Sequence, residues 1–387
     1  MRVNPPELNE LSPEEAWFIK ALPKTQLHVH LEGTMDAETL LTLAKKNEHP
    51  ELMNKSPDEI MAMYNYAPGP DGFTQFLKLF EECSKVIQSP DDIVYVIERL
   101  GEDAARQNIR YAEVTFTPTT IANQTHGVPY HKQLLALERG IQSVRESTAT
   151  SGRPVEIRFI LDHSRGYTAE DCIATANMCM QGYEAGSVVG IGLAGGEDGD
   201  HPVSQWARLI RSVTRGQIPF VPHVAETFDA GPEAIINAYD SYPDGFPRLG
   251  HGIQAARDPK VLTSLADGPV LELCPTSNLA TGAVLDLATM VEYVQVLQEA
   301  GVLYTINTDD PAQMPNILIP GQPNTLSKEF ELMVRLGLET PKSLARMALL
   351  GISASLLPEE QKLALMEEVC DDLAQLGTVL RQNLMLP

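Results

Sequence analysis

The amino-acid sequence predicts a (β/α)8 TIM barrel, with a helical insertion between the first two strands and additional helices at the C-terminus. Three observations lead to this fold. The chain has 387 residues, which suits a barrel of about 250 residues that carries insertions. Short apolar runs alternate along it with segments of helical spacing. Histidines and carboxylates stand where several of these runs end, which is where a β/α barrel builds its active site.

The apolar runs are short and rich in β-branched residues, as expected for strands that are buried on both faces of a parallel sheet. Helical patterns between them predict β/α units, and eight such units predict a closed barrel. A doubly wound open sheet is the alternative. The expected strands are Gln26–Leu31, Ile109–Phe116, Val155–Leu161, Val188–Leu193, Ile218–Ala225, Arg248–Ile253, Val270–Cys274 and Leu303–Asn307. The expected helices include Tyr130–Ser147, Ala169–Ala185, Pro232–Tyr239, Thr289–Ala300 and Leu326–Leu336.

Two regions exceed what a barrel requires. Residues 36–106 separate the first two strands and contain several helical patterns and the turn-rich stretch Tyr64–Gly72. We interpret them as an insertion over the mouth of the barrel, a candidate lid. Thr340–Leu350 and Pro358–Leu380 predict C-terminal helices. Because there is no internal repeat or low-complexity linker, we expect residues 1–387 to form one domain.

Composition and charge exclude several classes of protein. The net charge of −23 and the lack of a basic run argue against a nucleic-acid partner and favour a small-molecule substrate. Five cysteines without a C-x-x-C pair predict free thiols in a reducing compartment. The N-terminal residues do not resemble a signal peptide, and no stretch approaches the roughly 18 apolar residues of a membrane span. We therefore expect a cytoplasmic protein that does not bind membranes.

The strongest local motif is LHVHLEG at residues 27–33. Because side chains alternate along a strand, His28 and His30 point to the same face, toward the mouth of the barrel. Two imidazoles on one face are a natural pair of metal ligands. Two structural histidines near a strand end are the alternative.

Other strand ends favour the metal. The fifth run holds His223 and is followed by Glu226, the sixth holds His251, and the eighth precedes Asp309 and Asp310. A structural histidine has no reason to fall repeatedly at the catalytic end of a barrel. The remaining histidines are expected in helices or loops, in surface or structural roles: His49, His126, His131, His163 and His201.

Three imidazoles and one carboxylate suit zinc, which lowers the pKa of a water that it binds to about 7. We assign the ligands as His28, His30, His223 and Asp309. Glu226 can then supply a proton to the substrate, His251 can accept or steer the proton of the water, and Asp310 can orient the substrate. The fourth run, VVGIGLAG at 188–195, has no lysine to bridge two ions, so we expect one Zn²⁺ per chain.

These motifs together resemble the adenosine and adenine deaminase family, which belongs to the metal-dependent amidohydrolases. The motifs occur in family order and span residues 23–311. They are PKTQLHVHLEG at 23–33, GLAGGE at 192–197, HVAE at 223–226, RLGHG at 248–252, ELCPTSN at 272–278 and NTDDP at 307–311.

The resemblance implies a zinc-dependent hydrolytic deaminase with the same four ligands, among which His30 also faces the substrate. Glu226 matches the residue that protonates a ring nitrogen, and His251 matches the residue that handles the hydrolytic water. Gly195 and Asp310 match positions that hydrogen-bond the purine. Thr276, Ser277 and Asn278 also lie in a family motif, but a structural loop role suits them equally well.

Departures from the family pattern leave the substrate open. Glu32, near the sugar position, and Gly192 stand where nucleoside-type members have aspartate, whereas Gly195 fits a nucleoside. The segment YAEVTFTP at 111–118 is most similar to aminodeoxyfutalosine deaminases. We therefore expect a 6-aminopurine nucleoside, either adenosine or aminodeoxyfutalosine, to be converted to the 6-oxo product and ammonia. Free adenine ranks second.

Two other classes are alternatives. A barrel hydrolase that acts on a cyclic amide is disfavoured by Glu226 and by the missing lysine. A non-catalytic protein of this fold would be expected to have lost a ligand or the acid, and none is lost. Deaminases of tRNA or DNA use an H-x-E and P-C-x-x-C pattern that this chain lacks. No motif indicates an oligomeric state.

Overall fold

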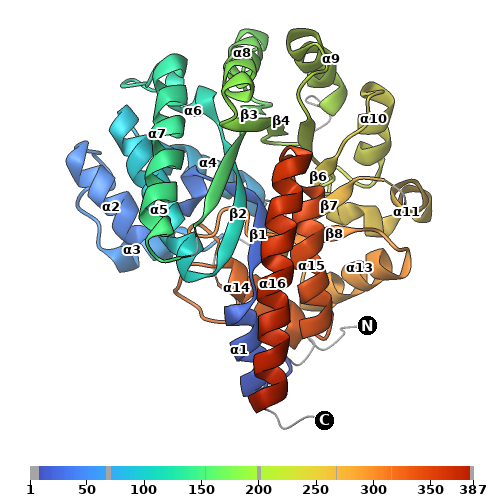
Figure 1. Ribbon diagram of the computed structural model, residues 1–387. Helices are drawn as coiled ribbons and strands as arrows, with labels where there is room; N and C mark the ends of the chain where they lie inside the picture. The colour runs from blue at the N-terminus through green and yellow to red at the C-terminus, as the bar shows by residue number, and fades with distance from the viewer. Residues whose placement is uncertain are drawn as a thin grey trace.

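Parallel strands form a barrel in the computed structural model (Figure 1). They are hydrogen-bonded in sequence order from β1 to β8. A bridge between Val29 and Asp309 joins the last strand to the first, where His30 N donates to Asp309 O at 2.9 Å. The predicted barrel is confirmed, and the open sheet is excluded. The structure describes residues 8–66, 71–152, 154–197, 202–266, 268–314 and 316–383.

Each predicted apolar run overlaps a strand, although several bounds differ. The largest difference is in the third strand, which continues to Ser164 and therefore carries Asp162 and His163. The strands are β1 (Lys24–His30), β2 (Ile109–Phe116), β3 (Glu156–Ser164), β4 (Val188–Ala194), β5 (Phe220–Val224), β6 (Arg248–His251), β7 (Val270–Leu273) and β8 (Tyr304–Ile306).

Helices surround the barrel, as Figure 1 shows. Their ends follow local chemistry: Thr168 and Asp171 form a capping box at the start of α8, and Gly186 ends that helix at a φ of 79°. The outer helices are α7 (Tyr130–Ala149), α8 (Ala169–Ala185), α9 (Val203–Thr214), α10 (Glu233–Ser241), α11 (Pro259–Leu265), α13 (Leu287–Glu299) and α14 (Leu326–Arg335). Short turns of helix are α6 (Pro118–Ala122), η2 (Ile253–Arg257) and α12 (Pro275–Ala280). Among the described residues, none of the helices combines the length and apolar character that spanning a membrane requires.

The insertion after β1 is helical, as predicted. It contains η1 (Glu32–Thr34), α2 (Ala37–Lys46), α3 (Pro57–Met63), α4 (Asp71–Ser84) and α5 (Pro90–Arg106). α5 packs closely on α7 because both helices have a glycine at the contact: a Cβ on Gly101 would meet Val144, and one on Gly140 would meet Ile97. Part of the turn-rich stretch, residues 67–70, lies outside the described residues. That the insertion moves as a lid stays a prediction.

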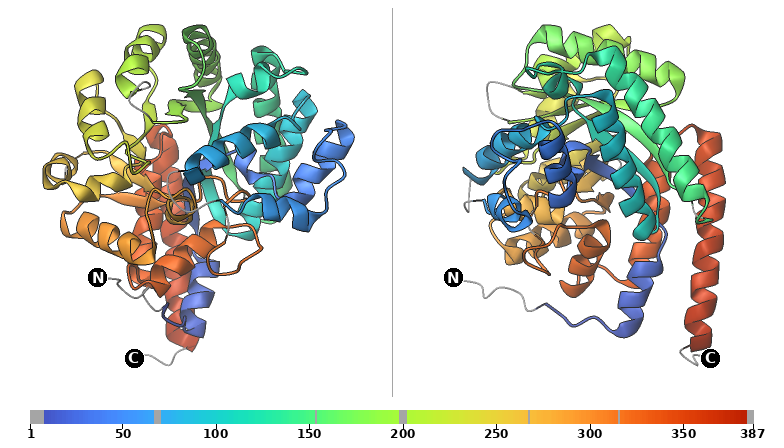
Figure 2. Two further views of the ribbon diagram at one scale, coloured as in Figure 1. Left: turned by 180° about the vertical axis from the view of Figure 1, so that it is seen from behind. Right: turned by 90° about the vertical axis from the view of Figure 1, so that its left-hand side faces the viewer.

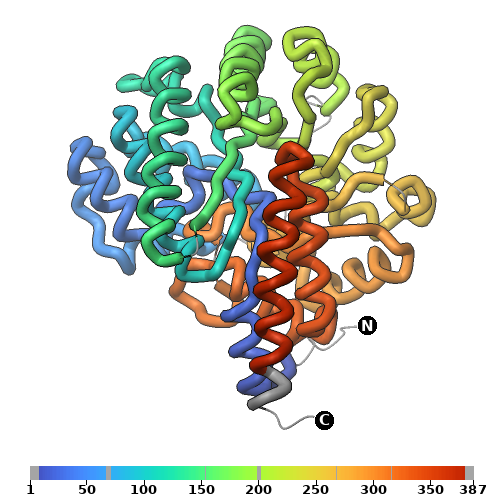
Figure 3. Tube along the Cα trace, in the orientation of Figure 1, coloured from blue at the N-terminus to red at the C-terminus, as the bar shows by residue number. Residues whose placement is uncertain are grey.

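The C-terminal helices α15 (Pro341–Ala354) and α16 (Glu359–Asn383) cross the face of the barrel that is nearest the viewer in Figure 1. The insertion helices are seen best from behind, in the left panel of Figure 2. α16 also runs beside α1 (Pro13–Ala21), as the tube in Figure 3 shows. Leu356, which follows α15, reaches into the barrel and would contact a Cβ on Gly190 at 2.8 Å.

A polar layer crosses the middle of the barrel. The buried Arg248 guanidinium on β6 forms ion pairs with Glu113 on β2 and Glu272 on β7, and it also donates to Ala354 O at 2.8 Å. Glu113 accepts further hydrogen bonds from Tyr111 Oη at 2.8 Å and Leu356 N at 2.6 Å. The layer therefore links the strands to the C-terminal segment, and Glu272 extends it toward the catalytic end.

Candidate active site

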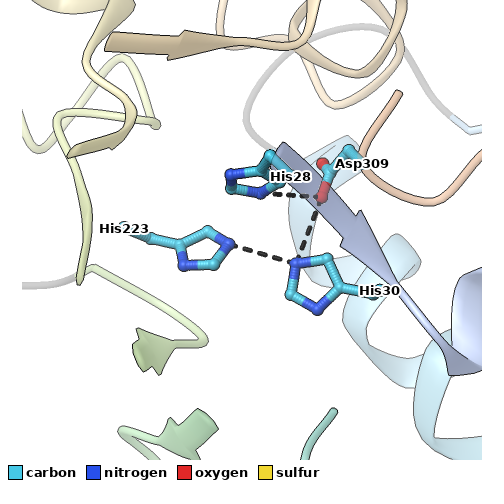
Figure 4. A group of neighbouring side chains, drawn as sticks. All are labelled: His28, His30, His223 and Asp309. Carbon is cyan, nitrogen blue, oxygen red and sulfur yellow. Dashed lines mark hydrogen bonds and ion pairs between the residues drawn. The ribbon is translucent and has the colours of Figure 1, made fainter. Parts of the chain in front are cut away.

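The four predicted ligands meet at the carboxyl ends of the strands (Figure 4). His28 and His30 come from β1, His223 from β5, and Asp309 from the segment after β8. The Nε2 atoms of His28 and His30 each lie 3.3 Å from Asp309 Oδ1. The Nε2 atoms of His30 and His223 are 3.1 Å apart. One donor atom from each residue lies within 4.8 Å of every other, so one ion can contact all four.

The donor set fits a single divalent cation. All four side chains are buried, and His28 Nε2 has no hydrogen-bond partner among the described residues. A buried ring nitrogen without a partner is costly unless something else satisfies it. Three imidazole nitrogens and one carboxylate oxygen are the donors that zinc prefers, with room for a water. A second, overlapping group of His28, His251, Cys274 and Asp309 shares two of these residues.

Three of the four ligands are held by neighbouring groups. His28 Nδ1 lies 2.8 Å from Glu272 Oε2, and His223 Nδ1 lies 3.1 Å from Leu193 O. Ser277 Oγ donates to Asp309 Oδ2 at 2.6 Å. Such contacts fix the tautomer and orientation of a metal ligand. Burial disfavours the charge on Glu272, but Arg248 and His28 outweigh it and hold the pKa of that carboxyl below its usual value.

Glu226 lies at the same site, immediately after β5. Its Oε1 is 3.6 Å from His251 Nε2. Glu197 fixes this segment by accepting from the backbone N–H groups of Ala225 and Glu226 at 2.9 and 3.1 Å. Burial, together with the carboxylates of Asp309 and Glu197, raises the pKa of Glu226 to about 8. Glu226 therefore carries a proton at neutral pH, as a general acid must.

His251 ends β6 and is fully buried. Its Nδ1 lies 3.1 Å from Asn278 Nδ2, and its Nε2 faces Glu226 and lies 3.8 Å from Asp309 Oδ2. Burial, and the neighbouring His28, lower the pKa of His251 to about 3, which keeps the ring neutral. The residue can therefore exchange a proton with a group held between it and Glu226.

The backbone is strained at these strand ends. Ala225, His251 and Asp309 have φ values of 54°, 55° and 63°, in the left-handed region that non-glycine residues rarely adopt. Such residues cluster at functional sites, where the fold holds them in place. At Gly195, after β4, φ is 87°, a conformation that glycine adopts without strain.

A pocket opens at this site and is lined by three of the four ligands, His30, His223 and Asp309. Apolar residues of α4, the end of β4 and the glycines that follow it also line the pocket. Among the residues predicted to bind the substrate, His30, Gly195 and Asp310 line the pocket, as does Glu226. Glu32 and His251 are not among the lining residues. Glu32 Oε1 instead accepts from Thr117 N at 3.0 Å.

The backbone of Gly33 passes close to the carboxylate of Asp310. A Cβ on Gly33 would overlap the Asp310 carboxylate, so only glycine fits at position 33. Burial and the adjacent Asp309 charge raise the pKa of Asp310 well above its usual value. Its Oδ1 has no partner among the described residues and is therefore available to a ligand in the pocket.

The remaining histidines lie away from these residues. His163 was expected in a helix or loop, but it lies on β3, where it is buried with its ring 4.3 Å from that of Trp206. The expected bound was wrong because β3 continues past Leu161. His49 is also buried and lies 3.3 Å from Glu82. His126 and His131 are exposed, and His201 lies outside the described residues.

Several residues at the site were not singled out from the sequence. Arg165 donates to Gly195 O at 3.1 Å and to His223 O at 2.6 Å, so it ties the pocket wall to a ligand strand. Glu197 and Glu272 belong to the motifs GLAGGE and ELCPTSN, and this membership was the available signal. Ser277 and Asn278, interpreted from the sequence as equally suited to a structural loop, contact Asp309 and His251.

Comparison with known proteins is consistent with this geometry. The family model described as adenosine deaminase matches residues 23–372. The chain belongs to the adenosine deaminase family. As a member it is an amidohydrolase, an enzyme that hydrolyses carbon–nitrogen bonds, and the resemblance inferred from its motifs is confirmed.

Curated relatives in this family differ in substrate. An aminodeoxyfutalosine deaminase from Streptomyces avermitilis is 31% identical over 357 residues, with 91% of each chain covered. An adenine deaminase from Acinetobacter baylyi is 27% identical and covers 91% of this chain and 98% of its own. Among solved structures, a zinc-bound amidohydrolase from Burkholderia ambifaria aligns with a TM-score of 0.81 at 23% identity, over 98% of this chain and all of its own. This last likeness supports the fold.

Proposed function

We propose that this enzyme is a single-zinc hydrolytic deaminase of 6-aminopurine nucleosides. The observation that carries the proposal is the pairing of a four-donor metal site with a buried carboxyl of raised pKa, Glu226, at one pocket. Hydrolysis at an aminopurine needs an acid beside the ring, because the ring must accept electrons without forming a bare anion.

The zinc ion would be held by His28, His30, His223 and Asp309. When bound, it supplies a Lewis acid and makes a water acidic enough to react at neutral pH. The chain's own groups do the rest. Glu226 gives its proton to the ring nitrogen beside the amino-bearing carbon, and the neutral His251 takes up and returns the proton of the attacking water at Nε2.

Gly195 and Asp310 orient the purine in this proposal. Burial and the adjacent Asp309 raise the pKa of Asp310, which favours the protonated form that can donate a hydrogen bond to a ring nitrogen. Gly195 lines the pocket and has no side chain of its own, so a flat ring can approach its backbone. The aromatic side chains of α4 that line the pocket, Phe73, Phe76 and Phe80, exclude water from the reacting face.

The pocket favours a nucleoside over a nucleotide. Among the described residues that line it there is no lysine or arginine, whereas Glu81 lies at its edge. A phosphate group would meet a carboxylate and no cation, which is unfavourable. The similarity to an aminodeoxyfutalosine deaminase, at 31% identity, supports including a modified nucleoside in the class. Free adenine is the second candidate because adenine deaminases match most of the chain.

The test is a panel of substrates followed by the change in ultraviolet absorbance and by release of ammonia. We expect turnover of adenosine or aminodeoxyfutalosine, weak turnover of AMP, none of a cyclic amide, and about one zinc per chain by elemental analysis. Turnover of free adenine alone would replace the nucleoside assignment by the second candidate. Turnover of the cyclic amide without any aminopurine would refute both.

A further inference from the structure

One ligand, His30, differs from the other two histidines in the contacts of its second ring nitrogen. His28 has Glu272 at Nδ1 and His223 has the carbonyl of Leu193. The polar contacts of the His30 side chain within the described ranges all involve Nε2, the atom that faces the ion. A histidine that binds a metal almost always donates its other N–H to a carboxylate, a carbonyl or a water. A partner for His30 Nδ1 is therefore expected close by.

Asp162 is a buried carboxylate without an assigned role. It lies on β3 and is 1% exposed, and neither oxygen has a hydrogen-bond partner among the described residues. It does not line the pocket, so it does not contact the substrate. The strand register brings it close to His30, because His30 pairs with Thr115 on β2 and Thr115 pairs with Ile160, two residues before Asp162 on β3. The charge of His30 also acts on the Asp162 carboxyl. Burial of an unpaired carboxylate is costly, which indicates that it serves a neighbouring group.

The neighbouring strand makes room for this carboxylate. Asp162 pairs in register with Gly192 on β4, and a Cβ on Gly192 would overlap Asp162 Oδ1. Gly192 does not have a positive φ, so its backbone conformation does not require glycine. Glycine is needed here because it has no side chain to collide with Asp162. One carboxylate therefore fits between these two strands, and β3 provides it.

We propose that Asp162 is a positioning residue, which accepts a hydrogen bond from His30 Nδ1–H and so holds the imidazole with Nε2 toward the zinc. A small rotation of either side chain when the ion binds would close this bond. The proposal rests on the zinc site of the proposed function. It predicts that the position of the carboxylate matters and that its strand of origin does not.

The test compares zinc affinities, measured by competition between the metal-free protein and a chromophoric chelator. We expect Asp162→Ala to weaken zinc binding about 10- to 100-fold. Asp162→Asn, which keeps an acceptor, should lose less. The double variant Asp162→Ala/Gly192→Asp returns a carboxylate from β4 and should restore most of the affinity. Ile160→Ala is the matched control. It shortens a buried side chain two residues earlier on the same face of β3, so it should lower stability without changing zinc affinity.

The outcomes distinguish a failure of the proposed function from a failure of the role of Asp162. A wild-type protein that neither binds zinc nor deaminates a purine refutes the proposed function itself. A wild type that does both, with zinc affinity equal in Asp162→Ala, overturns only the role of Asp162. That role is also overturned if Ile160→Ala weakens zinc binding as much as Asp162→Ala. If the double variant does not fold, as judged by circular dichroism, the zinc affinities of Asp162→Ala and Ile160→Ala decide whether Asp162 has this role.

Discussion

Two polar regions of the same barrel differ in how their buried groups are satisfied. In the middle layer, Arg248 is paired with Glu113 and Glu272, and Glu113 also accepts from Tyr111 and Leu356. At the catalytic end, His28 Nε2, His251 Nε2 and Asp310 Oδ1 have no hydrogen-bond partner within the described part of the chain. Both regions are buried, so burial alone does not distinguish them.

This difference distinguishes buried polar groups that stabilise the fold from those that are available to bind a ligand. A buried polar group that is fully hydrogen-bonded contributes to a defined fold, whereas one left without a partner costs about 1–3 kcal/mol. The catalytic end carries this cost at several atoms, and an ion, a water and a substrate can recover it. Substitutions in the two regions should therefore affect different quantities.

The largest effect is expected for Glu226→Gln at the catalytic end. The amide keeps the shape of the carboxyl but does not readily give up a proton, so kcat should fall by about 10²- to 10⁴-fold. Zinc content and the thermal unfolding midpoint should stay near wild type. Elemental analysis, thermal unfolding and steady-state kinetics on one preparation measure all three.

Glu233→Gln is the matched control, since it changes an exposed glutamate at the start of α10. Its kcat should equal that of wild type. If Glu226→Gln retained near-native turnover with a full complement of zinc, the carboxyl would not be the acid.

Substitutions in the middle layer should lower the free energy of unfolding more than they lower kcat. Glu113→Gln removes one of the two carboxylates that pair with the buried Arg248, and breaking a buried pair in this way costs about 3 kcal/mol or more. The free energy of unfolding in urea, measured with zinc in excess, should fall by this amount, while kcat of the folded enzyme changes little. Loss of kcat without loss of stability would erase the contrast between the two regions.

An exposed ion pair provides the comparison for this loss. Asp244 pairs with Arg211 at 2.6 Å, and both side chains are more than two-fifths exposed. Asp244→Asn should lower stability much less than Glu113→Gln does, because solvent screens an exposed pair. Equal losses in Glu113→Gln and Asp244→Asn would argue against the importance of burial.

The last effect is a dependence of stability on pH, and it concerns Lys24 at the start of β1, a buried amine whose hydrogen bonds go to backbone carbonyls. Its Nζ donates to Leu22 O and Gln107 O, both at 2.9 Å, and burial lowers the pKa of Lys24 to about 7. Between that value and its usual 10.5, the unfolded chain binds a proton that the folded chain does not. Stability should therefore rise with pH across this range, by at most about 1.4 kcal/mol per unit.

Lys24→Met removes the titrating group and provides the reference. The difference in free energy of unfolding between wild type and this variant, followed from pH 7 upward, isolates the contribution of Lys24. A difference that is constant with pH would mean that the amine stays charged in the folded protein.

The sequence predicted the barrel and the metal ligands for local reasons. Strands are indicated by β-branched runs, and the residues that follow them meet at one end of any such barrel. His28, His30, His223 and Asp309 could therefore be grouped without coordinates. The bounds were less certain: β3 continues to Ser164 because its polar end, which carries Asp162 and His163, is buried by tertiary contacts that no local pattern displays.

The groups that hold the ligands could not be derived in the same way. Glu272 and Asp162 act across strands, and their partners depend on register and on which neighbour has no side chain, as Gly192 does. The helix Val203–Thr214 was also missed, although its amphipathic spacing was a usable signal. Pairwise geometry of this kind enters only once the strands are placed beside one another.

The left-handed backbone at Ala225, His251 and Asp309 has a consequence for engineering. An L-amino acid in this conformation costs about 1–2 kcal/mol, so glycine at such a position relieves a standing penalty. Selection for thermal stability alone would favour that exchange at Ala225, which is next to Glu226, the proposed general acid. Stability and kcat are thus opposed at a single residue, so each variant selected for higher stability should also be assayed for activity.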